Sequence, residues 1–214
     1  MNRLRAPLLI TVTGPSGTGK DAVIKGLTEL DPTIQRFTTA TTRAPRPGEV
    51  DGVNYHYLSR ERFEEKLSNG DFLEHNPSYH TNLYGTLRAD LEGVWAKGAD
   101  AISDINIEGV LAFREKLPAQ HFAILLMPPS RERLFQRLTQ RNPELAEEGK
   151  RRFKAVEPDL EHLHDPHYVF TNPDMRGSKL TDYDVIFTND DLEVTTYAVH
   201  ARILAERAKR AGVA

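Results

Sequence analysis

Apolar residues follow two patterns along this chain of 214 residues. Short continuous apolar runs are typical of buried strands, whereas apolar positions three and four apart are typical of helices. Strands are expected over residues 8–12, 55–58, 101–105, 122–127 and 185–188. Helices are expected over residues 21–30, 60–67, 88–97, 108–116 and 192–210, with a solvated helical pair over 131–152. This alternation predicts an α/β fold whose parallel sheet has helices on both faces.

Turn and capping residues divide these elements. Ser59 and Ser130 stand where a side-chain oxygen commonly caps the first turn of a helix. Residues 43–48 read Arg-Ala-Pro-Arg-Pro-Gly, and their prolines and glycine exclude regular structure. We therefore expect residues 38–87 to form a small subdomain that carries a basic loop.

A glycine-rich run follows the first expected strand directly. Its eight residues are Gly14, Pro15, Ser16, Gly17, Thr18, Gly19, Lys20 and Asp21. Glycines allow a turn with positive φ that points N–H groups at an anion, and the next helix offers its partly positive N-terminus. Seven of the eight positions fit G-x-x-x-x-G-K-[ST], but Asp21 stands where a hydroxyl is expected. The run predicts a nucleotide phosphate site rather than an ordinary glycine turn.

The composition is that of an ordinary folded protein large enough for one full core. Its 28 basic and 31 acidic residues argue against nucleic acid or an anionic membrane as a partner. The chain has no cysteine, which fits a cytoplasmic protein without disulfides or cysteine metal sites. Arg3 and Arg5 precede an apolar run that is too short for a signal peptide. The sequence leaves open whether the protein forms a homo-oligomer.

Arg43 and Arg46 lie three positions apart in the basic loop, and Tyr55 follows them. Guanidinium groups bind phosphate oxygens in pairs and a phenol adds a donor, so these side chains suit a second phosphate. By charge alone, a solvated basic loop is the stronger alternative.

The surrounding motifs change that balance. Residues 41–55, Thr-Thr-Arg-Ala-Pro-Arg-Pro-Gly-Glu-Val-Asp-Gly-Val-Asn-Tyr, closely resemble the monophosphate-binding loop of guanylate kinases, as do Phe72-Leu73-Glu74 and Tyr84-Gly85-Thr86. With the glycine loop and runs 104–109 and 185–192, the resemblance spans residues 8–205 in the family's motif order. It implies a P-loop NTPase-type fold with a monophosphate-binding subdomain and a helical lid. The implied activity is transfer of the γ-phosphoryl group of ATP to GMP or dGMP.

The resemblance assigns the acceptor side residue by residue. The GMP phosphate would be held by Arg43, Arg46, Tyr55 and Tyr84. Guanine would be faced by Thr39, Glu74, Thr86 and Asn106. A carboxylate can accept hydrogen bonds from the N1–H and exocyclic amine of guanine, a pattern that adenine does not present. Without its motif, Glu74 would be taken for a surface carboxylate.

On the donor side, Lys20 and the loop amides would hold the ATP phosphates together with Mg²⁺. Arg141 and Arg152 match lid arginines of the family and would act with Lys20 in catalysis, with Arg137 a weaker third. A solvated or ion-paired arginine is an equal alternative for each of them. The metal would be organised by Asp21 and, through water, Asp104, while Asn189 would lie beside the ATP base.

Three features depart from the family pattern. Asp21 could bind Mg²⁺ or repel the β-phosphate, and we favour the metal role. Asn106 stands where the family usually has a guanine-facing aspartate. The extra stretch near residues 164–180 adds His162, His164 and His167, which are better explained as a surface cluster than as a metal site.

We therefore expect one guanylate-kinase-like domain over residues 1–214. Its parts would be a core (8–37, 88–130 and 180–214), a GMP-binding subdomain (38–87), a lid (131–160) and an insertion (161–180). One alternative is a related kinase for another small phosphorylated acceptor, such as ribose 1,5-bisphosphate, because such kinases share a loop ending Gly-Lys-Asp. Another is an interaction module that no longer binds ATP, although the intact glycine loop argues against it.

Overall fold

The computed structural model describes residues 6–78, 82–140, 146–162, 165, 167–171 and 175–212. Its elements in chain order are β1 (Leu9–Thr13), α1 (Lys20–Leu30), β2 (Ile34–Arg36), β3 (Ala40–Thr41), β4 (His56–Tyr57), α2 (Arg60–Ser68), β5 (Phe72–Ser78), β6 (Asn82–Leu87), α3 (Arg88–Trp95), β7 (Asp100–Asp104), α4 (Ile107–Lys116), β8 (His121–Met127), α5 (Arg131–Gln140), α6 (Ala146–Val156), the 3₁₀ helices η3 (Glu157–His162) and η4 (Leu180–Asp182), β9 (Val185–Thr188) and α7 (Leu192–Arg210). Within these residues, no helix combines the length and apolarity needed to cross a bilayer.

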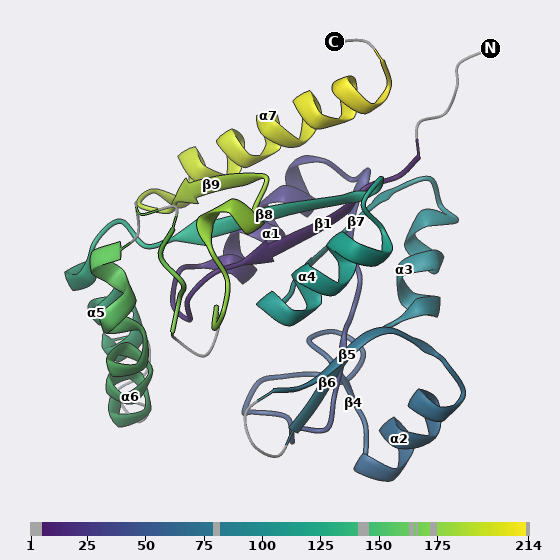
Figure 1. The fold of residues 1–214 in the computed structure, drawn as a ribbon, viewed down its shortest axis with the longest axis horizontal. Helices are drawn as coiled ribbons and strands as arrows, with labels where there is room; N and C mark the ends of the chain where they lie inside the picture. Colours follow the sequence, from purple (N-terminus) through teal and green to yellow (C-terminus); the bar gives the residue numbers. More distant parts are fainter. Residues whose placement is uncertain are drawn as a thin grey trace.

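The main sheet is parallel, with strand order β2-β7-β1-β8-β9. Alternate residues of its strands pack into two hydrophobic layers because successive side chains of a strand point to opposite faces. Ile10 and Val12 pack with α1 and α7, whereas Leu9 packs with α3 and α4. Figure 1 shows α7 over one face of the sheet and α4 over the other. This architecture confirms the predicted α/β class with a helix-flanked parallel sheet.

The expected single strands and helices are present within two residues of their predicted bounds. The capping predictions are also confirmed, since the Ser59 hydroxyl accepts from the Arg62 N–H and the Ser130 hydroxyl from the Arg133 N–H, each at 3.2 Å. The helical pair is present as α5 and α6. Hydrophobic periodicity was therefore sufficient for the longer elements that pack against the main core.

A second sheet, with order β4-β3-β6-β5, is formed by residues between 40 and 87. The sequence analysis missed β2, β3, β5 and β6. These strands are very short or, like β5, are interrupted by charged residues, amides and a proline, so their alternation is weak. Strand β2 is held by its pairing with β7 in the main sheet. Strands β3, β5 and β6 are stabilised by pairing across the second sheet, where the stacked rings of Phe63 and Phe72 have centroids 4.3 Å apart.

Helices α5 and α6 pack closely against each other. A Cβ atom at Gly149 would lie 2.1 Å from the carbonyl oxygen of Leu138, so only glycine permits this approach. Leu134, Phe153 and Val156 form a small separate core between the helices and η3. In Figure 1 this pair stands at the left and the second sheet at the lower right, both below the main sheet.

The described part of the expected insertion (161–180) packs into the main core. Phe170 and Met175 are buried in the same layer as Leu9 and α4. Asp159 lies beneath this segment and accepts hydrogen bonds from the Tyr168 hydroxyl and from the N–H and hydroxyl of Thr171. The segment therefore contributes to the stability of the core.

Phe170→Ala should lower the free energy of unfolding by about 3–5 kcal/mol, because it removes a fully buried ring and leaves a cavity. The matched control is Val169→Ala, since Val169 is 45% exposed and its loss should cost about 0.5 kcal/mol or less. Urea unfolding followed by circular dichroism measures both variants. Equal, small effects would show that the segment is not part of the core.

Candidate active site

The glycine loop connects the end of β1 to the start of α1, at the centre of the main sheet. Gly14 has φ 146°, and a Cβ atom there would lie 2.1 Å from the carbonyl oxygen of Leu126 in β8. A side chain at this position would therefore push the loop away from the sheet. Parallel pairing of β1 with β7 and β8 brings the following loops to the same edge of the sheet.

Hydrogen bonds from three side chains to backbone carbonyls stabilise the conformation of the glycine loop. Lys20 Nζ donates to the carbonyl oxygens of Gly14 at 2.7 Å and Pro15 at 3.2 Å. The Thr18 hydroxyl also donates to Pro15, at 2.9 Å. Asn189, which follows β9, is buried and donates from Nδ2 to the Thr18 carbonyl at 2.7 Å. Asn189 thus supports the loop directly, and its expected place beside the ATP base stays a prediction.

Two carboxylates converge beside this loop on one arginine. Nη2 of Arg36, the last residue of β2, donates to Oδ1 of Asp21 and to Oδ1 of Asp104, each at 2.8 Å. Burial raises the pKa of Asp104, and nearby Asp21 raises it further, whereas Arg36 and Lys20 oppose the shift. The two predicted metal ligands therefore lie together, and both are paired with a cation that the sequence analysis did not identify.

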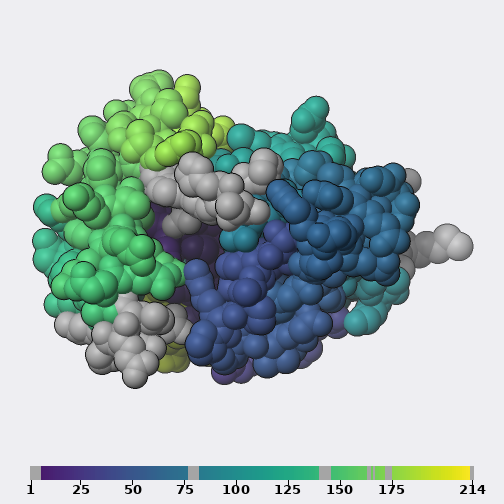
Figure 2. Space-filling model, turned by 90° about the horizontal axis from the view of Figure 1, so that it is seen from below, coloured from purple at the N-terminus to yellow at the C-terminus, as the bar shows by residue number. Residues whose placement is uncertain are grey.

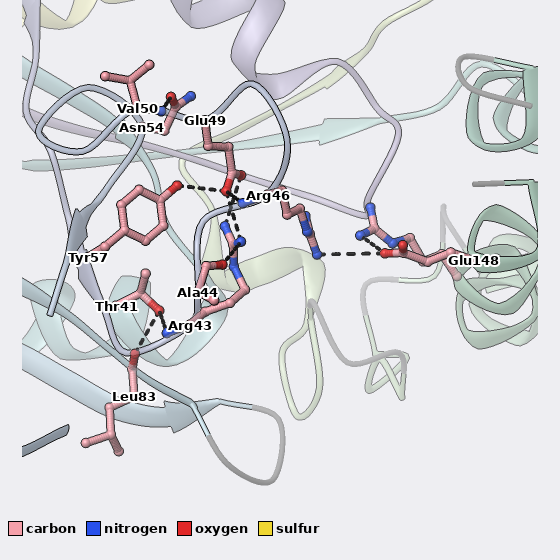
Figure 3. Close-up of polar contacts among 11 residues, drawn as sticks. Thr41, Arg43, Ala44, Arg46, Glu49, Val50, Asn54, Tyr57, Leu83 and Glu148 are labelled. Carbon is pink, nitrogen blue, oxygen red and sulfur yellow. Dashed lines mark hydrogen bonds and ion pairs between the residues drawn. The ribbon is translucent and has the colours of Figure 1, made fainter. Parts of the chain in front are cut away.

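Glu49 stabilises the basic loop by accepting hydrogen bonds from Arg43 and Arg46 (Figure 3). Arg43 makes two hydrogen bonds to this carboxylate, Nη1 to Oε2 at 2.9 Å and Nη2 to Oε1 at 3.0 Å. The Tyr57 hydroxyl and the Arg46 N–H also donate to Oε2, each at 2.7 Å. Burial acts to raise the pKa of Glu49, but these hydrogen bonds outweigh it and lower the pKa to about 2. Glu49 is therefore ionised and fixes the direction of Arg43.

Tyr55 and Tyr84 lie next to Arg43. Their ring centroids are 6.0 Å apart, and the Arg43 guanidinium carbon lies 5.4 Å from the Tyr55 ring centroid. Burial raises the pKa of the Tyr55 hydroxyl, and the negative charge of Asp104, at the end of β7, raises it further. The structure thus brings together Arg43, Tyr55 and Tyr84, three of the four residues expected at the acceptor phosphate.

The fourth residue, Arg46, points away from them toward α6 (Figure 3). Its Nη2 lies 3.8 Å from Oε1 of Glu148, and the same carboxylate oxygen pairs with Arg152 one turn later. Arg152 also donates from Nη1 to the Ser16 hydroxyl in the glycine loop at 3.3 Å. Glu148 therefore connects the basic loop, helix α6 and the glycine loop.

The other two candidate lid arginines are Arg137 and Arg141. Arg137 donates from Nη2 to the carbonyl oxygen of Asp190 at 3.1 Å, which ties α5 to the segment after β9. Arg141 lies outside the described residues, so its assigned role stays a prediction. Of the pair expected to act with Lys20, only Arg152 is placed, and it lies against the loop.

Glu74 is buried although it lies on β5, an edge strand of the second sheet, and only 6% of the residue is exposed. Thr86, opposite it in β6, donates from Oγ1 to Glu74 Oε1 at 2.7 Å. Burial raises the pKa of Glu74 to about 7, although the bonds from Thr86 and the charge of Lys116 act to lower it. The pair Glu74 and Thr86 thus forms a compact, buried polar site.

Two amides extend this polar site toward the main sheet. Asn106 caps α4 by accepting from the Gly109 N–H at 3.1 Å, and its Oδ1 also accepts from Nδ2 of Asn76 at 3.1 Å. Asn76 is buried and lies on β5 two residues after Glu74. Thr39 is buried at the start of the same sheet, just before β3. The expected guanine-facing residues therefore lie on neighbouring elements, with Asn76 as an addition.

Figure 2 shows a hollow between the green surface of α5 and α6 and the blue surface of the second sheet, with purple atoms of the N-terminal part at its floor. The ion pair of Arg46 with Glu148 joins these two surfaces. The loop after β1 and the basic loop are therefore parts of one cleft.

The expected histidine cluster is described only in part. His162 stacks on the ring of Tyr168 at a centroid distance of 3.9 Å, and His164 lies outside the described residues. Where the chain is described, no group of three or more histidines and carboxylates is suited to hold a metal ion.

Sequence reasoning missed four polar residues of the cleft, namely Arg36, Glu49, Asn76 and Glu148. Glu49 could have been found, because it is the acidic residue closest in sequence to the two loop arginines. Arg36 and Asn76 have partners about 15 or more residues away, and the bond from Glu148 to Arg46 crosses to another element, so no local pattern indicates these contacts. Only the pairing of Glu148 with Arg152, one turn later on α6, is local.

Comparison of the sequence and the fold with those of known proteins identifies one family. The guanylate kinase family model matches residues 6–206. The chain is 38% identical over 180 residues to a guanylate kinase of Alkalilimnicola ehrlichii, covering 84% of this chain and 87% of that protein. It is 39% identical over 202 residues to one of Symbiobacterium thermophilum, covering 94% and 87%. A crystal structure of guanylate kinase from Anaplasma phagocytophilum superposes with a TM-score of 0.67 at 28% identity, covering 94% and 87%.

Glu49→Gln should lower the free energy of unfolding at neutral pH by about 1–3 kcal/mol, because it leaves the half-buried Arg43 without its carboxylate. The pKa of Glu49 is depressed, so its contribution is present above its unfolded value of 4.5 and is lost as pH falls toward about 2. Urea unfolding near pH 7 and pH 3 measures both effects. Glu65→Gln, in an exposed pair with Arg62, is the control and should change little.

Proposed function

Because this chain belongs to the guanylate kinase family, we propose that its cleft holds ATP at the loop of residues 14–21 and GMP at the second sheet. The protein is an ATP-dependent nucleoside monophosphate kinase, which transfers a phosphoryl group from ATP to GMP. dGMP presents the same base and phosphate and is proposed as a second acceptor. The observation that carries this assignment is the buried Glu74–Thr86 pair, whose neighbour Asn76 bonds to Asn106, just after β7 and on the edge of the main sheet that carries the glycine loop.

Phosphoryl transfer requires positioning and charge neutralisation more than covalent chemistry. We assign the phosphates of ATP to Lys20 and the loop amides, supported from below by Asn189. Arg43, Tyr55 and Tyr84 orient the phosphate of GMP, with Glu49 fixing the angle of Arg43. Arg152 and Arg46 reach the space between the two phosphates from opposite sides, and Glu148 holds both of them there. Arg141 is proposed as a further lid arginine.

The guanine specificity rests on the ionised form of Glu74. Its carboxylate would accept from the N1–H and the exocyclic amine of guanine, while the Thr39 hydroxyl would donate toward O6. The Thr86 hydroxyl would donate toward O6 once it turns away from Glu74, because it has a single proton. Asn106 and its partner Asn76 would close the side of the pocket next to α4. AMP would not supply the two donors that guanine offers to the buried carboxylate, which is costly in a site of this burial.

The residues present suit Mg²⁺. Asp21 and Asp104 already direct carboxylate oxygens at one cationic centre, and Mg²⁺ prefers one or two carboxylates together with phosphate oxygens and water. These two residues would hold the ion, directly or through water. When bound, the ion would neutralise charge on the β- and γ-phosphates of ATP. We further propose that the protein acts in the cytoplasm, without nucleic acid or membrane as a partner.

Acceptor specificity tests the proposal. In an ADP-coupled assay with MgATP, GMP and dGMP should be phosphorylated, and AMP should have a kcat/KM lower by at least about a thousandfold. UMP and ribose phosphates complete the panel. Equal turnover of AMP would overturn the guanine assignment, and turnover of a ribose phosphate alone would point to the rival small-molecule kinase.

The matched variant for this assay is Glu74→Gln, which replaces one acceptor by a donor. Its kcat/KM for GMP should fall by about a hundredfold, whereas its KM for ATP should not change. Glu65→Gln, on the exposed face of α2, should leave both constants as they are. A Glu74 variant with unimpaired GMP efficiency would remove this residue from the base site.

GMP affinity should also depend on pH through Glu74. The pKa of this carboxyl is raised to about 7, so the carboxylate that guanine requires is lost as pH falls below that value. Affinity should then fall by about tenfold per pH unit. Calorimetric titration of GMP between about pH 8 and pH 5 measures this, and the difference from Glu74→Gln removes the titration of the GMP phosphate itself. Parallel curves for the two proteins would contradict the role of Glu74.

A further inference from the structure

Arg36 lies at a point where three parts of the molecule meet. It ends β2, the edge strand of the main sheet, and its guanidinium reaches both the first turn of α1 and the end of β7. A single nitrogen, Nη2, donates to Asp21 and to Asp104 at 2.8 Å each. The side chain is 29% exposed, compared with 20% for Asp104 and 73% for Asp21. Arg36 therefore reaches from the edge strand of the main sheet to the residue that follows the glycine loop.

The position of Asp21 makes such a cation necessary. Asp21 directly follows Lys20, so its carboxylate stands beside a loop that gathers phosphates. A carboxylate near a phosphate is repelled, and the repulsion is stronger where low-dielectric walls exclude water. Lys20 alone would face two carboxylates together with the phosphates. With Arg36, the two positive charges balance Asp21 and Asp104, and the loop keeps the attraction of its amides and helix N-terminus.

Arg36 is more than a link between β2 and β7. Those strands are already paired through their backbones from Ile34 to Arg36. The bond from Arg36 to Asp104 adds one more link between the same two strands. The bond to Asp21 instead joins β2 to the first turn of α1, so it does not contribute to pairing within the sheet. It fixes the carboxylate that departs from the usual phosphate-loop pattern.

We propose that Arg36 is a positioning residue for nucleotide binding: it forms a compensated pair with Asp21 that allows a carboxylate to stand beside the ATP phosphates, and it aligns Asp21 with Asp104. This inference rests on the proposed function, which places ATP at the glycine loop. It also explains why Asp21 need not repel the β-phosphate.

Calorimetric binding of ADP, with Mg²⁺ and with EDTA, tests the proposal in two variants. Arg36→Met keeps the apolar stem but removes the charge, and should weaken ADP binding in EDTA by about tenfold or more. Because a metal ion can replace the lost positive charge, the loss should be smaller with Mg²⁺. Adding Asp21→Ser to Arg36→Met should return the affinity to within about threefold of the parent, since it removes the uncompensated carboxylate.

Two controls separate this effect from loss of folding. Arg88→Met removes an exposed arginine whose Glu92 partner lies one turn away, and should not change ADP affinity. Arg36→Lys keeps the charge and should bind ADP within about threefold of the parent even if Arg36→Met folds poorly. Thermal unfolding of each variant gives its stability independently of nucleotide.

The outcomes are distinct. Unchanged ADP affinity in Arg36→Met, or a double variant as weak as the single one, would overturn the compensated pair. Tighter binding of ADP with Mg²⁺ in Arg36→Met than in the parent would show that Arg36 competes with the metal, which also overturns the proposal. If the unmodified protein binds no ADP, the proposed function itself fails.

Discussion

The parallel pairing of β1 is the constraint on which the site depends. This strand is buried along its whole length and is hydrogen-bonded to β7 on one side and β8 on the other. Its chain can leave the sheet only by the sharp turn at Gly14, which touches the backbone of β8. The same pairing delivers Asp104 from β7 and, through β8 and β9, Asn189 to the same edge. Hydrophobic burial of one strand thus sets where the phosphates would bind.

Around this edge, each arginine placed in the cleft has a carboxylate partner. Arg36 has two, Arg43 has Glu49, and Arg46 and Arg152 share Glu148. Guanidinium groups are long and flexible, so pairing orients them before a phosphate arrives and lowers the ordering cost of binding. The pairing also keeps a cluster of cations from repelling itself. A phosphate that enters must then compete with these carboxylates, which favours ligands of high negative charge.

The two sheets divide the chemistry. The main sheet supplies the glycine loop and the carboxylates, which we propose act on the phosphates, whereas the second sheet supplies Glu74 and Thr86, which we propose bind the base. The second sheet has a small core of its own, built around Phe63 and Phe72. It contacts the main body through Leu73, which packs in the main core, and through the hydrogen bond between Asn76 and Asn106. Its contact with α6 runs through Arg46 and Glu148.

The sequence by itself determined the features that are encoded within a few residues. Apolar runs and helical periodicity predicted the main sheet and its helices, and the spacing of glycines and Lys20 predicted the phosphate loop. The motifs around Arg43 and Glu74 predicted a second site. Only the tertiary structure decided the pairings between distant residues: Arg36 with Asp21 and Asp104, and Glu148 with Arg46. It also decided that Phe170 and Met175 belong to the core and that β5 and β6 form strands. These features depend on partners that the fold brings together, and no local pattern specifies a distance between residues far apart in the chain.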